Sequence, residues 1–114
     1  MKNKNGRELP LSTVRLVVAF CGEYFRMKEA LEKGKLTHEL TVSYQSYTNV
    51  IYLETERACG LVGCQVEELI LDIAKNRGYR ASALQGLIGR GRYTRAKARA
   101  VRYIAERLLL AEER

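Results

Sequence analysis

Apolar residues recur at helical intervals along most of the chain, and a glycine follows where each pattern stops. Between Ser12 and Lys33 the apolar positions fall three or four residues apart, and Gly34 comes next. The positions are Val14, Val17, Val18, Cys21, Phe25 and Leu31. This spacing predicts a first helix with Ser12 or Thr13 as its N-cap and Gly34 as its stop. Gly22 costs the helix about 1 kcal/mol in propensity and allows a bend there.

Residues 35–59 are compatible with two structures. The stretch 40–47 is rich in β-branched and aromatic residues, which favours a strand. The apolar residues of the whole segment 35–59 nevertheless repeat at helical intervals, and the chain offers no hairpin partner. They are Leu40, Tyr44, Tyr47, Ile51 and Ala58. We therefore predict a second helix that ends at Gly60 and includes residues 41–52, with Tyr44 and Tyr47 in the core rather than stacked on nucleic-acid bases.

The remaining periodicity predicts three more helices. The third contains Val66, Leu69, Ile70, Ile73 and Ala74 and is closed by Gly78. A short fourth helix, about Ala81 to Ile88, would place Leu84, Leu87 and Ile88 inward, followed by a tight turn over residues 89–92 and a last helix from about Tyr93 to Ala111. The prediction is an all-α fold: a compact bundle of about five helices forming a single domain over residues 1–114, with residues 1–10 frayed.

Charge is distributed unevenly along the chain. Residues 1–74 carry nine Lys/Arg against ten acids, a balance of −1, whereas residues 75–114 carry eleven Lys/Arg against three acids, a balance of +8. The whole excess of the net +7 therefore lies in the last third. Such an asymmetry favours a polyanionic partner over general solubility.

The last helix has the most informative pattern. Val101, Ile104 and Leu108 fall on one side with Ala105, widened by Ala98 and Leu109, whereas three arginines fall on the opposite side at spacings of four and three. We call these three, Arg95, Arg99 and Arg102, the basic ridge. Arg90, Arg92 and Lys97 crowd the start of the helix, and no acid occurs between Asp72 and Glu106. Cations at a helix N-terminus oppose the helix dipole, which suggests that an anion such as phosphate docks there. The alternative is a solvated charged face.

A short helix, a glycine turn and a longer basic helix together predict a helix-turn-helix-like part over residues 79–111. The match to the standard motif is imperfect. If Gly89 is the turn glycine, Arg90 and Arg95 stand where that motif usually has apolar residues. The turn would then be longer than the standard form, or the motif a variant.

Several short motifs resemble one family. They are Tyr24 to Lys28, Gly78 to Arg80, Arg92 to Lys97, Ala100-Val101 and Ile104 to Leu108. Together they cover about half the chain and resemble ArpU/RinA-type phage transcriptional regulators, whose last helix follows the pattern S-x-x-x-Y-x-x-x-K-x-x-A. Tyr93 and Lys97 match that pattern, whereas Gly91 and Arg92 stand where its serine belongs. The resemblance implies a prophage-encoded DNA-binding protein that activates late genes, and it adds Tyr93 to the candidate site. The candidate nucleic-acid-binding residues are thus Arg90, Arg92, Tyr93, Arg95, Lys97, Arg99 and Arg102.

The sequence favours no catalytic, metal or cofactor site. It contains no paired carboxylates, no nucleophile–base pair and no phosphate-binding glycine loop, so we expect a non-enzymatic protein without a cofactor. Cys59 and Cys64 form a C-x4-C pair, but only His38 and Cys21 could complete a zinc site, so we expect no metal. With no export signal or membrane span in the sequence, we expect a cytoplasmic protein with reduced thiols.

The leading hypothesis is therefore a protein that binds double-stranded DNA, a transcriptional regulator of phage or prophage type. A phage packaging protein (a terminase small subunit) is the alternative within DNA binding, and it would form a homo-oligomer. The alternative that does not involve DNA is a helical interaction protein whose basic end binds an acidic protein. The operator sequence, the oligomeric state and the choice between activator and repressor stay open.

Overall fold

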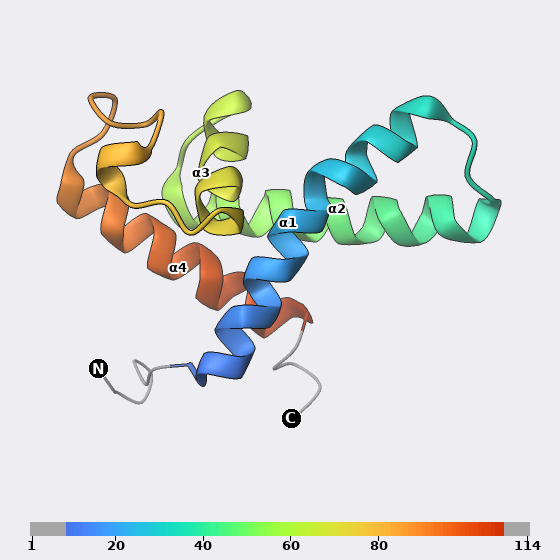
Figure 1. The fold of residues 1–114 in the computed structure, drawn as a ribbon, viewed down its shortest axis with the longest axis horizontal. Helices are drawn as coiled ribbons and strands as arrows, with labels where there is room; N and C mark the ends of the chain where they lie inside the picture. The colour runs from blue at the N-terminus through green and yellow to red at the C-terminus, as the bar shows by residue number, and fades with distance from the viewer. Residues whose placement is uncertain (1–8, 109–114) are drawn as a thin grey trace.

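The computed structural model describes residues 9–108, and all regular structure within them is helical (Figure 1). The elements are α1 (Leu11–Lys33), α2 (His38–Cys59), α3 (Cys64–Ala74), the single 3-10 turn η1 (Tyr79–Ala81) and α4 (Arg90–Leu108). The all-α class is confirmed. The described residues form four α-helices where about five were predicted, because residues 81–88 are not helical.

The first helix forms over the predicted stretch and runs unbroken through Gly22. It begins one residue earlier than expected, at Leu11, so Ser12 and Thr13 lie inside its first turn and neither acts as N-cap. Pro10 precedes the helix, and no side chain caps it. At the other end Gly34 has φ 70° and its N–H donates to the carbonyls of Ala30 and Leu31, a left-handed conformation that glycine adopts without strain. The C-terminal glycine signal is confirmed and the N-cap prediction is wrong.

Residues 41–52 are helical, as predicted, within α2. Thr37 begins the helix by accepting a hydrogen bond of 3.2 Å from the backbone N–H of Leu40, and Gly60 ends it with φ 70°. Local strand propensity is overridden because the helix buries Ile51, and with it Thr55 and Ala58, against the rest of the molecule.

The two tyrosines on α2 are less buried than predicted. Tyr44 is half-buried and the Arg26 guanidinium lies 5.4 Å from its ring centroid. Tyr47 is 39% exposed, and its ring stacks on that of Phe20 at a centroid distance of 5.8 Å. The prediction that both lie in the core is therefore wrong for Tyr47. The α1–α2 hairpin extends beyond the other helices at this end of the molecule (Figure 1), which leaves fewer elements to cover such side chains.

The segment between α3 and α4 differs most from the prediction. The third helix ends at Ala74, before the predicted stop at Gly78, and Asn76 turns the chain with φ 55°. Residues 82–89 then form turns instead of the predicted helix over 81–88. Leu84 and Ile88 are buried as expected, but Leu87 is 61% exposed. A helix-turn-helix needs a helix here, so the standard motif does not form between α3 and α4.

Side-chain hydrogen bonds explain why this segment prefers turns to a helix. The buried Ser82 hydroxyl accepts from the N–H of Leu84 at 2.9 Å and donates to Asp72 Oδ2 at 2.5 Å. Tyr79 Oη donates to the carbonyl of Ile88 at 2.7 Å and accepts from the N–H of Gly86 at 3.3 Å. Serine and tyrosine thus satisfy backbone groups that a helix would otherwise pair. We call residues 75–89 the ordered loop.

The last helix begins earlier than expected. The predicted tight turn over residues 89–92 is helical from Arg90 onward, since the N–H of Tyr93 donates to the carbonyl of Gly89 at 2.9 Å. The predicted end at Ala111 and most of the predicted frayed stretch 1–10 lie outside the described residues. One core joins all the elements, with α2 and α4 forming the broadest contact. Its main members are Val17, Cys21, Ile51, Val66, Leu69, Ile70, Ile73, Leu84, Ala100, Ile104 and Ala105. In residues 9–108, no helix combines the length and apolar character that crossing a membrane requires.

Candidate nucleic-acid interface

The interface is built on α4, whose inward face is formed by small and aliphatic residues. Ala96, Ala100 and Ile104 are at most 2% exposed, which seats the helix closely against the core. Because α4 is amphipathic, this burial turns the opposite side outward. Arg95 and Arg99 are exposed on that side, as predicted, whereas Arg102 is only half-exposed. Val101 and Leu108, predicted to be inward, are partly buried, and Ala98 is exposed.

Two members of the basic ridge, Arg95 and Arg99, form no ion pair within residues 9–108. No hydrogen bond or ion pair within residues 9–108 engages the guanidinium of Arg99, and that of Arg95 lies back along its own helix, above Gly91. No acid interrupts the helix before Glu106. No described acid neutralises either guanidinium, so both positive charges are exposed to solvent on the outward side of α4.

The start of α4 adds exposed cations and backbone donors. Arg90 is exposed, and its guanidinium lies 5.3 Å from the ring centroid of Tyr79 in a cation–π arrangement. The N–H groups of residues 90–92 have no acceptor among the described residues, since the first helical bond is donated by Tyr93. Free N–H groups at a helix start attract phosphate, and here arginines flank them.

Arg92 and Lys97 are engaged inside the protein. Arg92 Nη2 donates to the carbonyl of Cys59 at 3.3 Å, which ties α4 to the end of α2 while its side chain stays exposed. Lys97 Nζ donates to the carbonyl of Arg77, and burial lowers the pKa of this ammonium. Both belong to the site by position, but part of their hydrogen-bonding capacity is already used.

Tyr93 lies in the interior, in contrast to the expectation carried by the family resemblance. The side chain is 2% exposed, and its hydroxyl donates to Asp72 Oδ2 at 3.0 Å. Burial, reinforced by this carboxylate, raises the pKa of Tyr93 to about 12. A ring in this position cannot stack on a base or reach a phosphate without leaving the core. We correct the prediction: Tyr93 positions α4 and does not form part of the exposed face.

Two residues to which the sequence assigned no role in the site help to shape it. Asp72 is fully buried, and its Oδ1 lies 3.8 Å from Arg77 Nη1. Tyr79 packs edge to face on Tyr93 at 5.4 Å and supports Arg90. A further exposed cation, Arg80, lies on η1 next to Tyr79. The sequence contained one signal for the role of Asp72, namely that it is a carboxylate within the otherwise apolar stretch 69–74. A buried acid needs hydrogen-bond donors around it.

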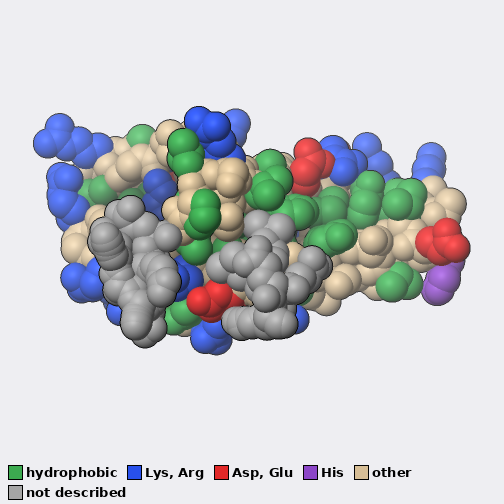
Figure 2. Space-filling view, turned by 90° about the horizontal axis from the view of Figure 1, so that it is seen from below, with side chains coloured by type: hydrophobic (Ala, Val, Ile, Leu, Met, Phe, Trp, Pro, Cys, Tyr) green, Lys and Arg blue, Asp and Glu red, His purple; other side chains and the backbone are tan. Residues whose placement is uncertain are grey.

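In the space-filling view, Lys and Arg side chains gather at the end of the molecule formed by the ordered loop and the first turns of α4 (left in Figure 2). The opposite end, the tip of the α1–α2 hairpin, carries acids and cations together. Among the described residues, no three His, Cys, Asp or Glu side chains are grouped so that they could hold a metal ion. Cys59 is buried, with its thiol 3.0 Å from the carbonyl of Thr55, and Cys64 is exposed.

Comparison of the chain with protein-family models, with curated proteins and with solved structures gave no match in any of the three.

Proposed function

We propose that this protein binds double-stranded DNA through the outward face of α4 and the ordered loop beside it, and that it regulates transcription, in the manner of phage or prophage regulators. The observation that carries the proposal is the pair Arg95 and Arg99, exposed on one face of α4 with no acid before Glu106. The residues proposed to contact DNA directly are Arg80, Arg90, Arg95, Arg99 and Arg102.

The docking element in this proposal is α4 alone, without a preceding short helix. An α-helix fits the major groove of B-DNA, and the ridge would face the base edges while cations at the helix start contact phosphates. The ordered loop takes the place of the first helix of a helix-turn-helix, because its hydrogen bonds to Asp72 and Tyr93 hold it against α4. The proposed role in transcription rests on the resemblance of short motifs within residues 24–28 and 78–108 to those of ArpU/RinA-type regulators.

The proposal is tested by fluorescence anisotropy with a labelled random duplex of about 20 base pairs. Neutralising about four or five phosphates gives a log–log salt slope near −4, since each contributes about −0.9. Selection of preferred sequences from a random pool then separates a regulator, which enriches one site, from a packaging protein, which must also assemble into a homo-oligomer. Absence of binding at about 50 mM salt overturns the proposal and assigns the basic face to an acidic protein.

A further inference from the structure

The outward side of α2 is exposed to solvent but carries no charge over most of its length. Residues 40–53 contain no Asp, Glu, Lys or Arg, although 29% of the residues in the chain are charged. On the side away from the core, Val42 and Leu53 are 51% and 54% exposed, and Ser46 and Asn49 are exposed between them. We call these four residues the α2 face. Hydrophobic side chains gather along this half of the molecule, with charged ones at its edge and its tip (right in Figure 2).

The residues of the α2 face are arranged symmetrically about its centre. They follow one another at spacings of four, three and four, with an aliphatic residue at each end and two polar residues in the middle. Helices that pack side by side use this spacing. If the α2 helix of a second copy lies antiparallel on the first, Val42 meets Leu53 of the second copy, and Ser46 meets its Asn49. Two-fold symmetry repeats both contacts, so the α2 face is complementary to itself.

The charges beyond the α2 face fit the antiparallel arrangement. Helical periodicity places Glu39 and Arg57 on the same flank of the face, at opposite ends, and His38 and Glu56 on the other flank. An antiparallel pair therefore brings Glu39 beside Arg57 of the second copy, and His38 beside its Glu56. A parallel pair would instead set each acid against its own copy. The Arg57 side chain is 58% exposed although it pairs with Glu54, so it keeps N–H groups for a second carboxylate.

The net charge of the protein favours a second copy at this face and at no other place. Two molecules with a charge of +7 repel each other through most of their surfaces, whereas the α2 face adds no repulsion and its flanks add attraction. We propose that the protein forms a two-fold symmetric dimer in which the α2 faces of two copies pack antiparallel. A contact of four helical turns buries about 1,000 Å² in total, the lower limit of a specific interface, so we expect a Kd in the micromolar range.

The dimer is tested by sedimentation velocity of the full chain, without DNA, at concentrations from about 1 to 200 μM. We expect monomer at the lower end and dimer at the upper end. Leu53→Lys should raise the Kd at least about tenfold, because it buries a cation in the contact. Leu87→Lys is the matched control: it adds the same charge at a leucine that is 61% exposed in the ordered loop, and it should leave the Kd unchanged.

Circular dichroism melts check that each variant folds. Val42→Lys should act as Leu53→Lys does, which keeps the test decisive if one of the two does not fold. A wild type that stays monomeric at about 200 μM would overturn the proposal. Folded variants of Val42 and Leu53 that dimerise as tightly as the wild type would also overturn it.

Disulfide formation between single-cysteine variants tests the antiparallel geometry. Val42→Cys and Leu53→Cys are each made with Cys64→Ser, since Cys64 is an exposed thiol. In the antiparallel dimer the two copies of position 42 lie about 16 Å apart along the helix axis, too far for a disulfide. An equal mixture of the two variants should therefore cross-link on a non-reducing gel, and neither variant alone should do so. Rapid cross-linking of either variant alone would refute the antiparallel arrangement.

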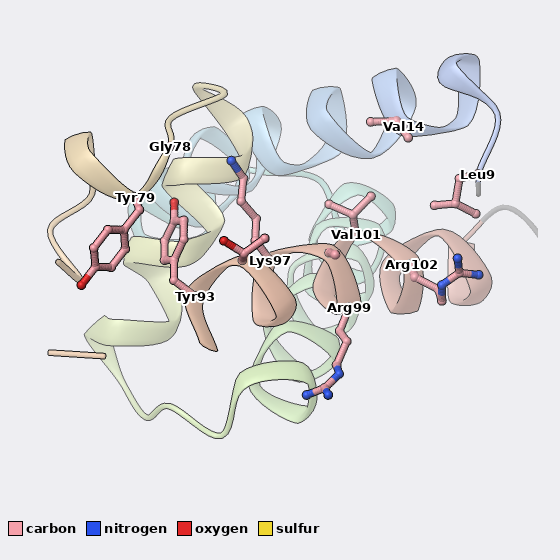
Figure 3. A pocket seen from close by; sticks show the side chains of 11 residues that line it. Leu9, Val14, Gly78, Tyr79, Tyr93, Lys97, Arg99, Val101 and Arg102 are labelled. Carbon is pink, nitrogen blue, oxygen red and sulfur yellow. The ribbon is translucent and has the colours of Figure 1, made fainter. Parts of the chain in front are cut away.

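The dimer has one consequence for DNA, and only this consequence rests on the proposed function. Each copy contributes one α4, from which Arg99 extends on the side opposite to Lys97 (Figure 3). Two such helices related by a two-fold axis should select a duplex site that is an inverted repeat, whereas Leu53→Lys should select half of it. A selected site without two-fold symmetry would refute this consequence. If the wild type dimerises but binds no duplex, the DNA proposal fails and the dimer stands; a monomer that binds duplex has the opposite meaning.

Discussion

Tyr93 and Asp72 are joined by a hydrogen bond of 3.0 Å between the tyrosine hydroxyl and Oδ2 of the carboxylate, deep in the molecule. The same oxygen accepts from Ser82 Oγ, so one carboxylate holds α3, the ordered loop and α4 together. The basic face of α4 owes its placement to this junction, because Tyr93 lies only two residues before Arg95.

The first prediction concerns this junction. Tyr93→Phe should lower the free energy of unfolding by about 1.5–3 kcal/mol, since a buried carboxylate loses one of its donors. Chemical denaturation measures the loss. Tyr103→Phe, a tyrosine that is only half-buried, serves as control and should change stability by less than about 0.5 kcal/mol. Equal stability of Tyr93→Phe and wild type would show that the junction does not hold α4.

A second junction connects α4 with α2. Glu54 is 6% exposed, and it pairs with Arg57 at 2.9 Å and with Arg107 at 3.0 Å. Arg107→Ala should therefore cost about 1 kcal/mol of stability, a modest value because the arginine itself is largely exposed and Arg57 still compensates the acid. Arg107→Lys should recover part of this, and Arg95→Ala should cost nothing measurable in the same denaturation assay. A fully stable Arg107→Ala would contradict the assignment.

The helices could be predicted from the sequence where a long periodic stretch ended in glycine. The ends of α1 and α2 at Gly34 and Gly60 follow from the left-handed conformation that those glycines adopt. The segment 81–88 could not be predicted, because its three large apolar residues fit a short helix and a set of turns equally well. Ser82 decides between them, through a bond to a residue ten positions earlier.

The candidate site was predictable only where it depends on the local pattern of one helix. The outward position of Arg95 and Arg99 follows from helical periodicity alone, since it depends only on residues of one helix. The inward position of Tyr93 depends on Asp72, 21 residues away, and no local pattern contains that contact. The short fourth helix was thus wrongly predicted and the burial of Tyr93 was missed, because both outcomes depend on long-range hydrogen bonds to Asp72.

The third prediction concerns the thiols. Burial raises the pKa of Cys21 to about 12 and also raises that of Cys59, whereas Cys64 is exposed. Only a thiolate reacts rapidly, so a disulfide reagent should label Cys64 alone in the folded protein and all three thiols after unfolding. Mass spectrometry counts the labels. Rapid native labelling of Cys21 would show that its thiol is not enclosed in the core.

The fourth prediction concerns acid stability. Partial burial opposes ionisation of Glu67, but hydrogen bonds from Lys28 and Tyr24 outweigh it and hold the pKa below its ordinary 4.5. The unfolded chain then binds more protons than the folded one near this pH. The stabilisation is present above pH 4.5 and is lost as the pH falls through the folded pKa.

Glu67→Gln should therefore flatten the dependence of stability on pH below 4.5 while lowering stability at neutral pH. Urea melts at a series of pH values measure both. Glu29→Gln is the matched control, because Glu29 is an exposed acid whose ion pair with Lys33 lies entirely on the surface of α1. An unchanged pH dependence in Glu67→Gln would refute the link between this carboxylate and acid stability.

The last prediction concerns the basic ridge itself. The double variant Arg95→Ala/Arg99→Ala should bind duplex DNA at least about tenfold more weakly, and its log–log salt slope should shrink by about 1.8, since each lost phosphate contact removes about 0.9. If one of the two arginines contacts a guanine edge, its single variant should lose about 1–3 kcal/mol and relax the preference at one base position. Both side chains are exposed, so thermal melts should be unchanged.

The control has to remove the same charge without touching α4. Arg107 is unsuitable because it pairs with the buried Glu54, so its loss would change stability as well as charge. Lys33→Ala/Lys35→Ala removes two exposed cations at the tip of the α1–α2 hairpin and should leave duplex affinity within about twofold and the salt slope unchanged. If both double variants weaken binding equally, net charge and not the ridge governs it. If the ridge variant binds as tightly as the wild type, the outward face of α4 must serve an acidic protein partner instead of DNA.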